Sequence, residues 1–169
     1  PDTSPLSGMD ILVVDDEAYN RRLVRMMLEK YRCNVLEAGN GQQAIELALN
    51  SRVDLILMDV LMKGMSGIEA ARTIREQIAG NRSYIKIIAN SAEISNEDYK
   101  SQKINGIDEF LAKPLEESAL IRAILRLIKN SPSVNKEPEN FDLKLNTLEN
   151  KSTQEAIFDL APLIASGKG

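Results

Sequence analysis

The sequence predicts an α/β fold in which a five-stranded parallel sheet is covered by helices on both faces, a doubly wound arrangement. Between residues 9 and 130, short apolar runs alternate with longer segments of helical periodicity, which is typical of consecutive βα units. The predicted strands are residues 11–14, 34–37, 55–58, 85–89 and 109–111. The first and third runs are the most apolar, as is expected of central strands that are buried on both faces.

Helical periodicity and capping signals follow these strands. Apolar residues recur at helical spacing within residues 23–28 and 120–128, and both sets are expected to pack on the sheet. Further helix starts are marked by capping-box spacing at Ser66–Glu69 and Ser95–Asp98, by Asn40-Gly41, and by Pro114 near the start of the last helix.

The folded domain is expected to span residues 9–130, after an N-terminal extension at residues 1–8. Beyond residue 130 the composition shifts to Ser, Pro, Asn and Glu, which predicts a flexible linker over residues 131–151. Residues 152–169 form a C-terminal tail with a short amphipathic pattern, in which Pro162 would break or kink a helix.

Composition excludes several classes of function. The chain contains no histidine, so it has no histidine nucleophile, metal ligand or phosphoryl donor. Its single cysteine, Cys33, excludes an internal disulfide, is predicted to be a buried core residue, and fits a reducing, cytoplasmic location. No apolar run approaches the roughly 20 residues that span a bilayer, and no basic stripe is present, so we expect no membrane contact and no direct nucleic-acid binding.

Charged and polar residues follow four of the predicted strands. Asp15 and Asp16 come after the first strand, Asp59 after the third and Ser91 after the fourth, and Lys113 lies just beyond the fifth. Because the carboxyl ends of parallel strands meet at one edge of the sheet, these side chains are expected to converge. Crowded carboxylates repel one another, so the cluster predicts a bound cation, and Mg²⁺ suits a ligand set made only of oxygens.

The same residues suit phosphoryl transfer. A single Asp at a strand end is more often a helix cap or turn residue, so the prediction depends on the whole set. The Lys113 ammonium can pair with phosphoryl oxygens, and the Ser91 hydroxyl can donate a hydrogen bond to one. Asp59, which ends the central strand, is the predicted nucleophile and would form an aspartyl phosphate.

These motifs resemble the receiver domain of bacterial response regulators and hybrid sensor kinases. The chemotaxis regulators are similar domains. The resemblance covers residues 9–130 and implies a flavodoxin-like (βα)5 fold with strand order 2-1-3-4-5. The matching segments are residues 11–17, Asp59 with Met62, Met65 and Gly67, residues 89–92 and residues 110–114.

The resemblance also implies roles for individual residues. Asp16, Asp59 and the backbone carbonyl of Leu61 correspond to direct metal ligands, and Asp15 acts on the metal through water. The implied ion is Mg²⁺, with Mn²⁺ as an alternative. Asp59 corresponds to the phosphoacceptor of the family. Ser91 and Lys113 correspond to its catalytic hydroxyl and lysine.

Two further features follow from the resemblance. Ser91 and Phe110 correspond to the switch pair, whose movement alters the surface of residues 95–130, and a dimer through the fourth helix, fifth strand and fifth helix is an expected assembly. The Lys113–Pro114 peptide bond is typically cis in the family. The chain departs from the pattern at Lys63 and Lys86, where proline is common, and at Asn90, where the family usually has an apolar residue.

The implied function is phosphorelay signalling, with a histidine kinase or histidine phosphotransfer domain as donor or acceptor of the phosphoryl group. Such a domain catalyses only its own phosphorylation and dephosphorylation. Asn20-Arg21 resembles hybrid histidine kinases, so a hybrid-kinase receiver is the leading hypothesis. A stand-alone or transcription-factor response regulator is the alternative. An Asp-nucleophile phosphohydrolase is remoter, because it requires Asp-x-Asp where this chain has adjacent Asp15 and Asp16.

Overall fold

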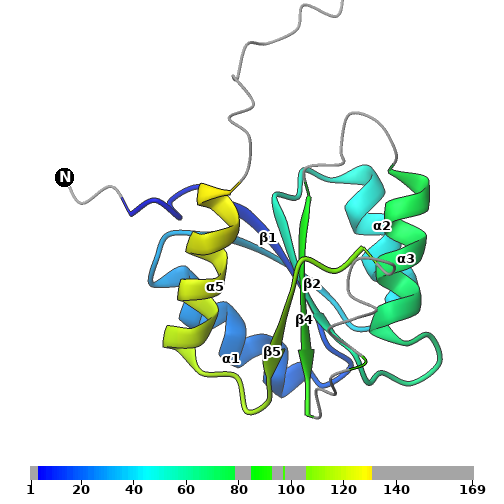
Figure 1. The fold of residues 1–169 in the computed structure, drawn as a ribbon. Coiled ribbons are helices and arrows are strands. Elements are labelled where there is room, and N and C mark those ends of the chain that lie inside the picture. The colour runs from blue at the N-terminus through cyan, green and yellow to red at the C-terminus, as the bar shows by residue number, and fades with distance from the viewer. Residues whose placement is uncertain (1–3, 79–84, 93–96, 98–105, 131–169) are drawn as a thin grey trace, which may run out of the picture. The chain divides into compact units, whose positions relative to one another are not determined.

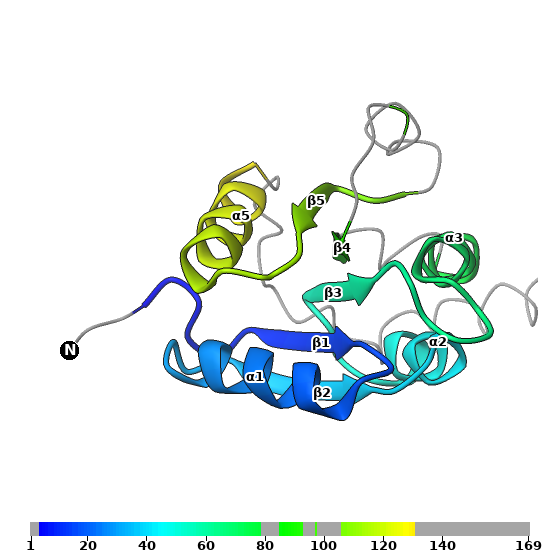
Figure 2. The same ribbon diagram turned by 90° about the horizontal axis from the view of Figure 1, so that it is seen from below.

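The computed structural model describes residues 4–78, 85–92, 97 and 106–130. In this part of the chain, helices α1 and α5 lie on one side of a parallel sheet and helices α2 and α3 on the other (Figures 1 and 2). The strands are β1 (Asp10–Val14), β2 (Asn34–Ala38), β3 (Leu55–Asp59), β4 (Lys86–Ser91) and β5 (Glu109–Ala112), and the helices are α1 (Ala18–Glu29), α2 (Gly41–Asn50), α3 (Gly67–Gln77) and α5 (Glu117–Lys129).

The strand order is β2-β1-β3-β4-β5, and every neighbouring pair is parallel. The predicted flavodoxin-like topology is therefore confirmed. Each predicted strand differs from the observed one by no more than two residues at either end. The predicted linker and C-terminal tail lie outside the described residues.

Alternation along the strands divides the core into two clusters. Leu12, Ile56 and Ile87 belong to the cluster that packs beneath α2 and α3. Their neighbours in sequence belong to the cluster beneath α1 and α5, together with Cys33, which is buried as predicted: Ile11, Val13, Leu55, Leu57 and Ile88. Because side chains alternate between the two faces of a strand, this division also determines which way the residues at the strand ends project.

Helix starts agree in part with the predicted capping signals. The Ser66 hydroxyl accepts a hydrogen bond from the Glu69 N–H, and the Glu69 carboxylate accepts one from the Ser66 N–H, so α3 begins with a complete capping box. Asn40 caps α2 through the Gln43 N–H. The predicted capping box of residues 95–98 lies outside the described residues. Helix α5 begins at residue 117, three residues after Pro114, which was expected to lie near its start.

Helix α1 packs on the sheet through only part of its predicted apolar face. Val24 and Leu28 are buried, whereas Leu23, which was expected to pack with them, is 38% exposed. Tyr19 and Met26 are also exposed, at 69% and 58%. None of the helices in the described ranges is long and apolar enough to cross a bilayer.

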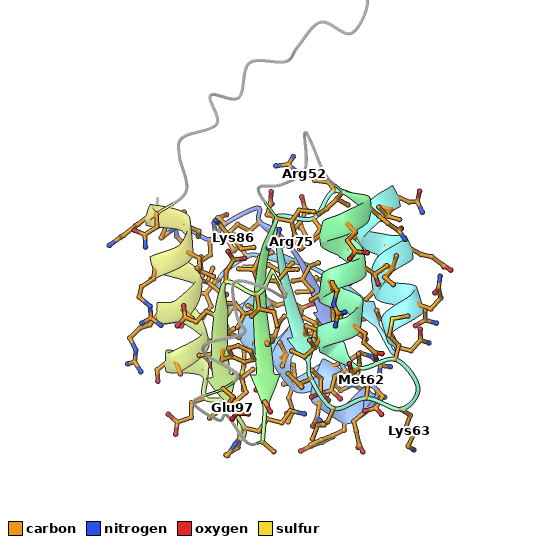
Figure 3. The ribbon with its side chains drawn as sticks, turned by 45° about the vertical axis from the view of Figure 1, so that its right-hand side comes forward. Arg52, Met62, Lys63, Arg75, Lys86 and Glu97 are labelled. Carbon is orange, nitrogen blue, oxygen red and sulfur yellow. The ribbon has the colours of Figure 1, made fainter. Side chains whose placement is uncertain are left out.

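The two ends of the sheet differ in how their charges are compensated. At the amino end of the strands, the Arg75 guanidinium donates hydrogen bonds to the carbonyls of Gly106 (2.9 Å) and Ile85 (2.6 Å) and to Asp108 (2.9 Å). These bonds attach α3 to the starts of β4 and β5. Figure 3 shows Arg75 and Lys86 at this end and the loop of Met62 and Lys63 at the other.

The start of α3 packs directly against the end of β3. A Cβ atom added to Gly67 would overlap the carbonyl oxygen of Asp59 and would approach the Met58 side chain to 2.9 Å. The Gly67 N–H donates a hydrogen bond to the Val60 carbonyl at 3.0 Å. The absence of a side chain at residue 67 therefore allows the loop after β3 to turn back over the strand end.

We predict that Gly67→Ala lowers the free energy of unfolding by about 2 kcal/mol, because the added methyl group must displace backbone at the end of β3. Urea denaturation measures the change. Gly39→Ala is the matched control, since its Cβ would meet no atom closer than 3.4 Å. Equal stability of the two variants would contradict this account of the packing.

Candidate functional site

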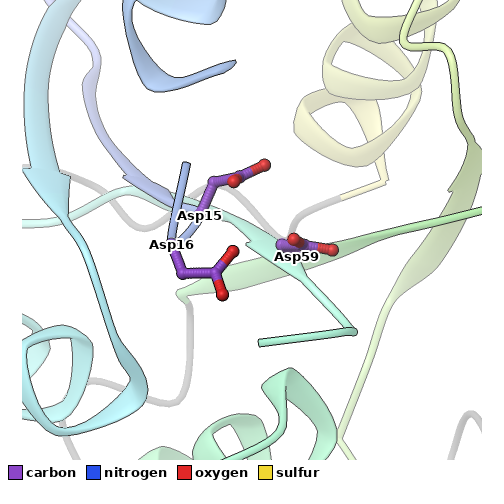
Figure 4. Close-up of side chains that lie close together, drawn as sticks. All are labelled: Asp15, Asp16 and Asp59. Atoms are coloured by element: carbon purple, nitrogen blue, oxygen red, sulfur yellow. The ribbon is translucent and has the colours of Figure 1, made fainter. Parts of the chain in front are cut away.

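The structure brings three carboxylates together at the carboxyl end of the central strands. Asp15 and Asp16 follow β1, and Asp59 is the last residue of β3. One oxygen from each lies within 4.8 Å of the others (Figure 4). Asp15 and Asp59 are only 5% and 4% exposed, and Asp16 is partly exposed. The convergence expected from the sequence is therefore present.

Lys113 supplies a positive charge to this cluster. Its Nζ atom lies 3.0 Å from Asp59 Oδ1 and 3.5 Å from Asp15 Oδ2. Its backbone N–H donates a hydrogen bond to the Ser91 carbonyl at 2.8 Å, which ties the segment after β5 to the end of β4. The bond between Lys113 and Pro114 is cis, as the resemblance implied.

The charges of the cluster do not balance. Three carboxyl groups surround one ammonium, so acidic groups outnumber basic ones in this cluster, as expected of a site that binds a cation. Burial raises the pKa of Asp59, and the Lys113 ammonium offsets this only in part. Burial lowers the pKa of Lys113, but the Asp59 and Asp15 carboxylates outweigh it, so that this pKa is raised and Lys113 remains charged.

The three carboxylates differ in the number of hydrogen bonds that they accept. Asp15 accepts hydrogen bonds from the Glu17 N–H (2.8 Å) and from the Asn20 side-chain amide (3.2 and 3.3 Å). The Arg21 guanidinium donates to the Asp15 carbonyl at 2.7 Å. Residues 20 and 21 resemble those of hybrid kinases, but their contacts with Asp15 were not predicted from the sequence.

Asp16 and Asp59 each accept a backbone hydrogen bond from the loop that follows β3. The Lys63 N–H donates to Asp16 Oδ2 at 3.1 Å, and the Leu61 N–H donates to Asp59 Oδ1 at 3.2 Å. Lys63 thus meets the acidic site through its backbone, and its side chain is exposed. This donor set, with two buried carboxylates and a third that is partly open, fits a small hard cation such as Mg²⁺.

Ser91 and Phe110 lie on the adjacent strands β4 and β5, where Phe110 pairs with Ala89, two residues before Ser91. Each is 6% exposed, Ser91 as the last residue of β4 and Phe110 on β5. The Phe110 ring belongs to the cluster beneath α2 and α3, so it already occupies an inward position. Residues 95, 96 and 98–105 of the predicted switch surface lie outside the described residues.

Comparison with known proteins agrees with this fold and site. The model of the response regulator receiver domain family matches residues 11–125. The transcriptional regulatory protein ResD of Bacillus subtilis is 37% identical over 121 residues, which are 72% of this chain and 48% of ResD. SrrA of Staphylococcus aureus, also a transcriptional regulatory protein, is 32% identical over 130 residues, or 76% of this chain and 51% of SrrA. The chain thus spans about half the length of these relatives.

Solved structures show the same similarity. The chemotaxis protein CheY4 of Vibrio cholerae has a TM-score of 0.67 and 28% identity, with 72% of this chain and 99% of CheY4 covered. The receiver domain of the sensor histidine kinase PA1611 from Pseudomonas aeruginosa has a TM-score of 0.64 and 32% identity, with 73% and 99% covered. That structure holds a magnesium ion coordinated in its active site cleft.

We predict that Asp59→Asn stabilises the metal-free protein at pH 7. The folded-state pKa of Asp59 is raised, so the ionised form opposes folding above that pKa, and the opposition is absent below the ordinary pKa of an aspartate. The expected gain is on the order of 1 kcal/mol at pH 7, and it fades as the pH falls through the raised pKa.

Urea denaturation of both proteins at several pH values, with a chelator present, measures this difference. Glu46→Gln on the exposed face of α2 is the control and should change stability little. A loss of stability in Asp59→Asn at pH 7 would show that the Lys113 ion pair outweighs the cost of burying the carboxylate.

Proposed function

Because the chain belongs to the family of response regulator receiver domains, we propose that Asp59 accepts a phosphoryl group from a phosphohistidine of a partner protein. The observation that carries this proposal is the position of the Asp59 carboxylate. It is buried, lies within 4.8 Å of two further carboxylates, and has the Lys113 ammonium 3.0 Å away. A nucleophile for phosphorus needs positive charge beside it to receive the phosphoryl oxygens, and this site combines both.

The residues that would hold Mg²⁺ differ in their roles. Asp16 and Asp59 are proposed as direct ligands, together with the Leu61 carbonyl. Asp15 has both oxygens engaged by Glu17, Asn20 or Lys113, which supports a role through water rather than direct contact. When bound, the ion supplies the positive charge that offsets the carboxylates and the phosphoryl oxygens.

The transfer itself conserves the phosphoryl group. An Asp59 oxygen forms a bond to phosphorus while the P–N bond of the phosphohistidine breaks, and the electron pair of that bond returns to the imidazole. Lys113 then pairs with the phosphoryl oxygens, and the Ser91 hydroxyl donates a hydrogen bond to one of them. The Leu61 side chain is 69% exposed and carries no polar group to align a hydrolytic water, which supports a long-lived aspartyl phosphate.

Phosphorylation of Asp59 is proposed to change the surface of residues 95–130 through Ser91 and Phe110. A dimer through that surface is one proposed assembly.

The relatives favour a response regulator as the parent protein, because ResD and SrrA are both transcriptional regulatory proteins. A response regulator is the alternative that the sequence left open beside a hybrid kinase. A hybrid kinase is the second candidate, supported by the similarity to the PA1611 receiver domain and by Asn20-Arg21. The full-length gene product distinguishes the two.

An apolar patch on α1 lies next to the proposed site. Tyr19, Leu23 and Met26 are spaced to share one helical face, and all three are exposed. Helix α1 begins two residues after Asp16, so a partner that covers this patch is brought close to the acidic site. We include this patch in the proposed docking surface for the phosphohistidine donor.

The proposed function is tested by incubating the protein with Mg²⁺ and acetyl phosphate, a small acyl phosphate. Intact-mass measurement should show one added phosphoryl group in the wild type and none in Asp59→Asn, because the amide cannot act as the nucleophile. Removal of Mg²⁺ with a chelator should suppress the addition. Equal labelling of the two proteins would refute the assignment of Asp59.

Docking is tested separately from chemistry. We predict that Met26→Glu slows phosphoryl transfer from a phosphohistidine protein by about tenfold, because a charge replaces apolar contact area, and leaves uptake from acetyl phosphate unchanged. Gln77→Glu adds the same charge at an exposed position at the end of α3 and is the control. A similar loss with both phosphoryl sources would place the defect in the fold or the site instead of the docking surface.

A further inference from the structure

Asn90 has a buried side-chain oxygen without a hydrogen-bond partner in the described part of the chain. It lies on β4, is 6% exposed, and its Oδ1 atom accepts no hydrogen bond in the described part of the chain. A buried polar group that lacks a partner lowers stability, and an apolar residue of similar size would avoid this cost. The fold does not explain why a residue that lowers stability occupies this position, so the explanation is sought in the residues next to Asn90.

The sheet register places Asn90 beside the proposed phosphoacceptor. Its Cα partner on β3 is Asp59, and its partner on β5 is Leu111. Residues paired in a parallel sheet project to the same face. Ile88, two residues before Asn90, packs in the cluster beneath α1 and α5 together with Leu57, which lies two residues before Asp59. Asn90 and Asp59 therefore project to the same face.

Lys113 follows β5, so β4 lies between the backbone of Lys113 and Asp59. It lies two residues beyond Leu111, which packs against the same cluster, and its backbone is bonded to the end of β4. Because β4 lies between β5 and β3, the Lys113 side chain reaches Asp59 Oδ1 by passing over the end of β4, where Asn90 is located. The ammonium carries three N–H groups, and its two carboxylate contacts leave one for a further acceptor.

We propose that Asn90 is a positioning residue for Lys113, and that its Oδ1 accepts a hydrogen bond from the ammonium once Asp59 is phosphorylated. This inference rests on the proposed function. Formation of the acyl phosphate removes the negative charge from the Asp59 carboxyl oxygens and places it on the phosphoryl oxygens, so Lys113 leaves its contact with Asp59 Oδ1. A neutral amide can hold the ammonium at that stage without repelling the phosphoryl dianion, whereas a carboxylate at residue 90 would repel it.

The test compares the full chain with Asn90→Leu, which removes the amide at similar volume. Asn90→Leu should raise the urea midpoint of unfolding, because the unpartnered polar group is gone. It should nevertheless slow phosphoryl uptake from acetyl phosphate by about tenfold, since Lys113 loses an acceptor. Ile88→Val, on the same strand and face, is the control that perturbs packing and leaves the uptake rate unchanged.

A second measurement separates positioning from packing. Nitrogen-15 NMR of the lysine ammonium groups in the Mg²⁺–beryllofluoride complex should show a Lys113 signal with slowed hydrogen exchange in the wild type, and this signal should be lost in Asn90→Leu. Unchanged uptake or an unchanged Lys113 signal in Asn90→Leu would overturn the inference alone. Failure of the wild type to take up a phosphoryl group on Asp59 would overturn the proposed function itself.

Discussion

Repulsion among three carboxylates at the carboxyl edge of the sheet is the constraint on which the rest of the site depends. Asp15 and Asp59 are buried, so their charges are only weakly screened by water. The chain opposes the repulsion with Lys113 and with backbone N–H groups of residues 17, 61 and 63, each aimed at a carboxylate oxygen. The donors of residues 61 and 63 lie in the loop after β3, and Gly67, which packs tightly against the end of that strand, follows the same loop.

The opposite end of the sheet shows what a fully compensated aspartate looks like. Asp108 accepts hydrogen bonds from the Arg75 guanidinium and the Ile87 N–H, and Lys86 lies 3.9 Å from its other oxygen. One carboxylate there meets two cations, whereas at the carboxyl end of the strands three carboxylates surround the Lys113 ammonium. Aspartate thus forms a compensated ion pair at the amino end of the strands and an uncompensated cluster at the carboxyl end. The uncompensated charge is what distinguishes the candidate site.

Much of this arrangement could be predicted from the sequence because it depends on local patterns. Apolar runs and capping residues gave the strands and two helix starts, and the parallel topology implied that strand ends such as Asp15 and Asp59 would meet. Helix α5 begins three residues after Pro114 because residues 113 and 114 form a bend, in which the Lys113 N–H is bonded to the Ser91 carbonyl. Leu23 was misplaced because helical spacing alone does not define how wide the buried face of a helix is.

Contacts that depend on register across strands were beyond prediction. The sequence marks Asn90 as unusual, but only the pairing of β3, β4 and β5 shows that it lies between Asp59 and the segment carrying Lys113. The same pairing defines a physical route from the site. Lys113 is bonded through its backbone to Ser91 and lies three residues after the buried Phe110. Under the proposed function, movement of Lys113 toward a phosphoryl group would act directly on β4 and β5. A shift in population would then require only that these two strands pack differently in the two states.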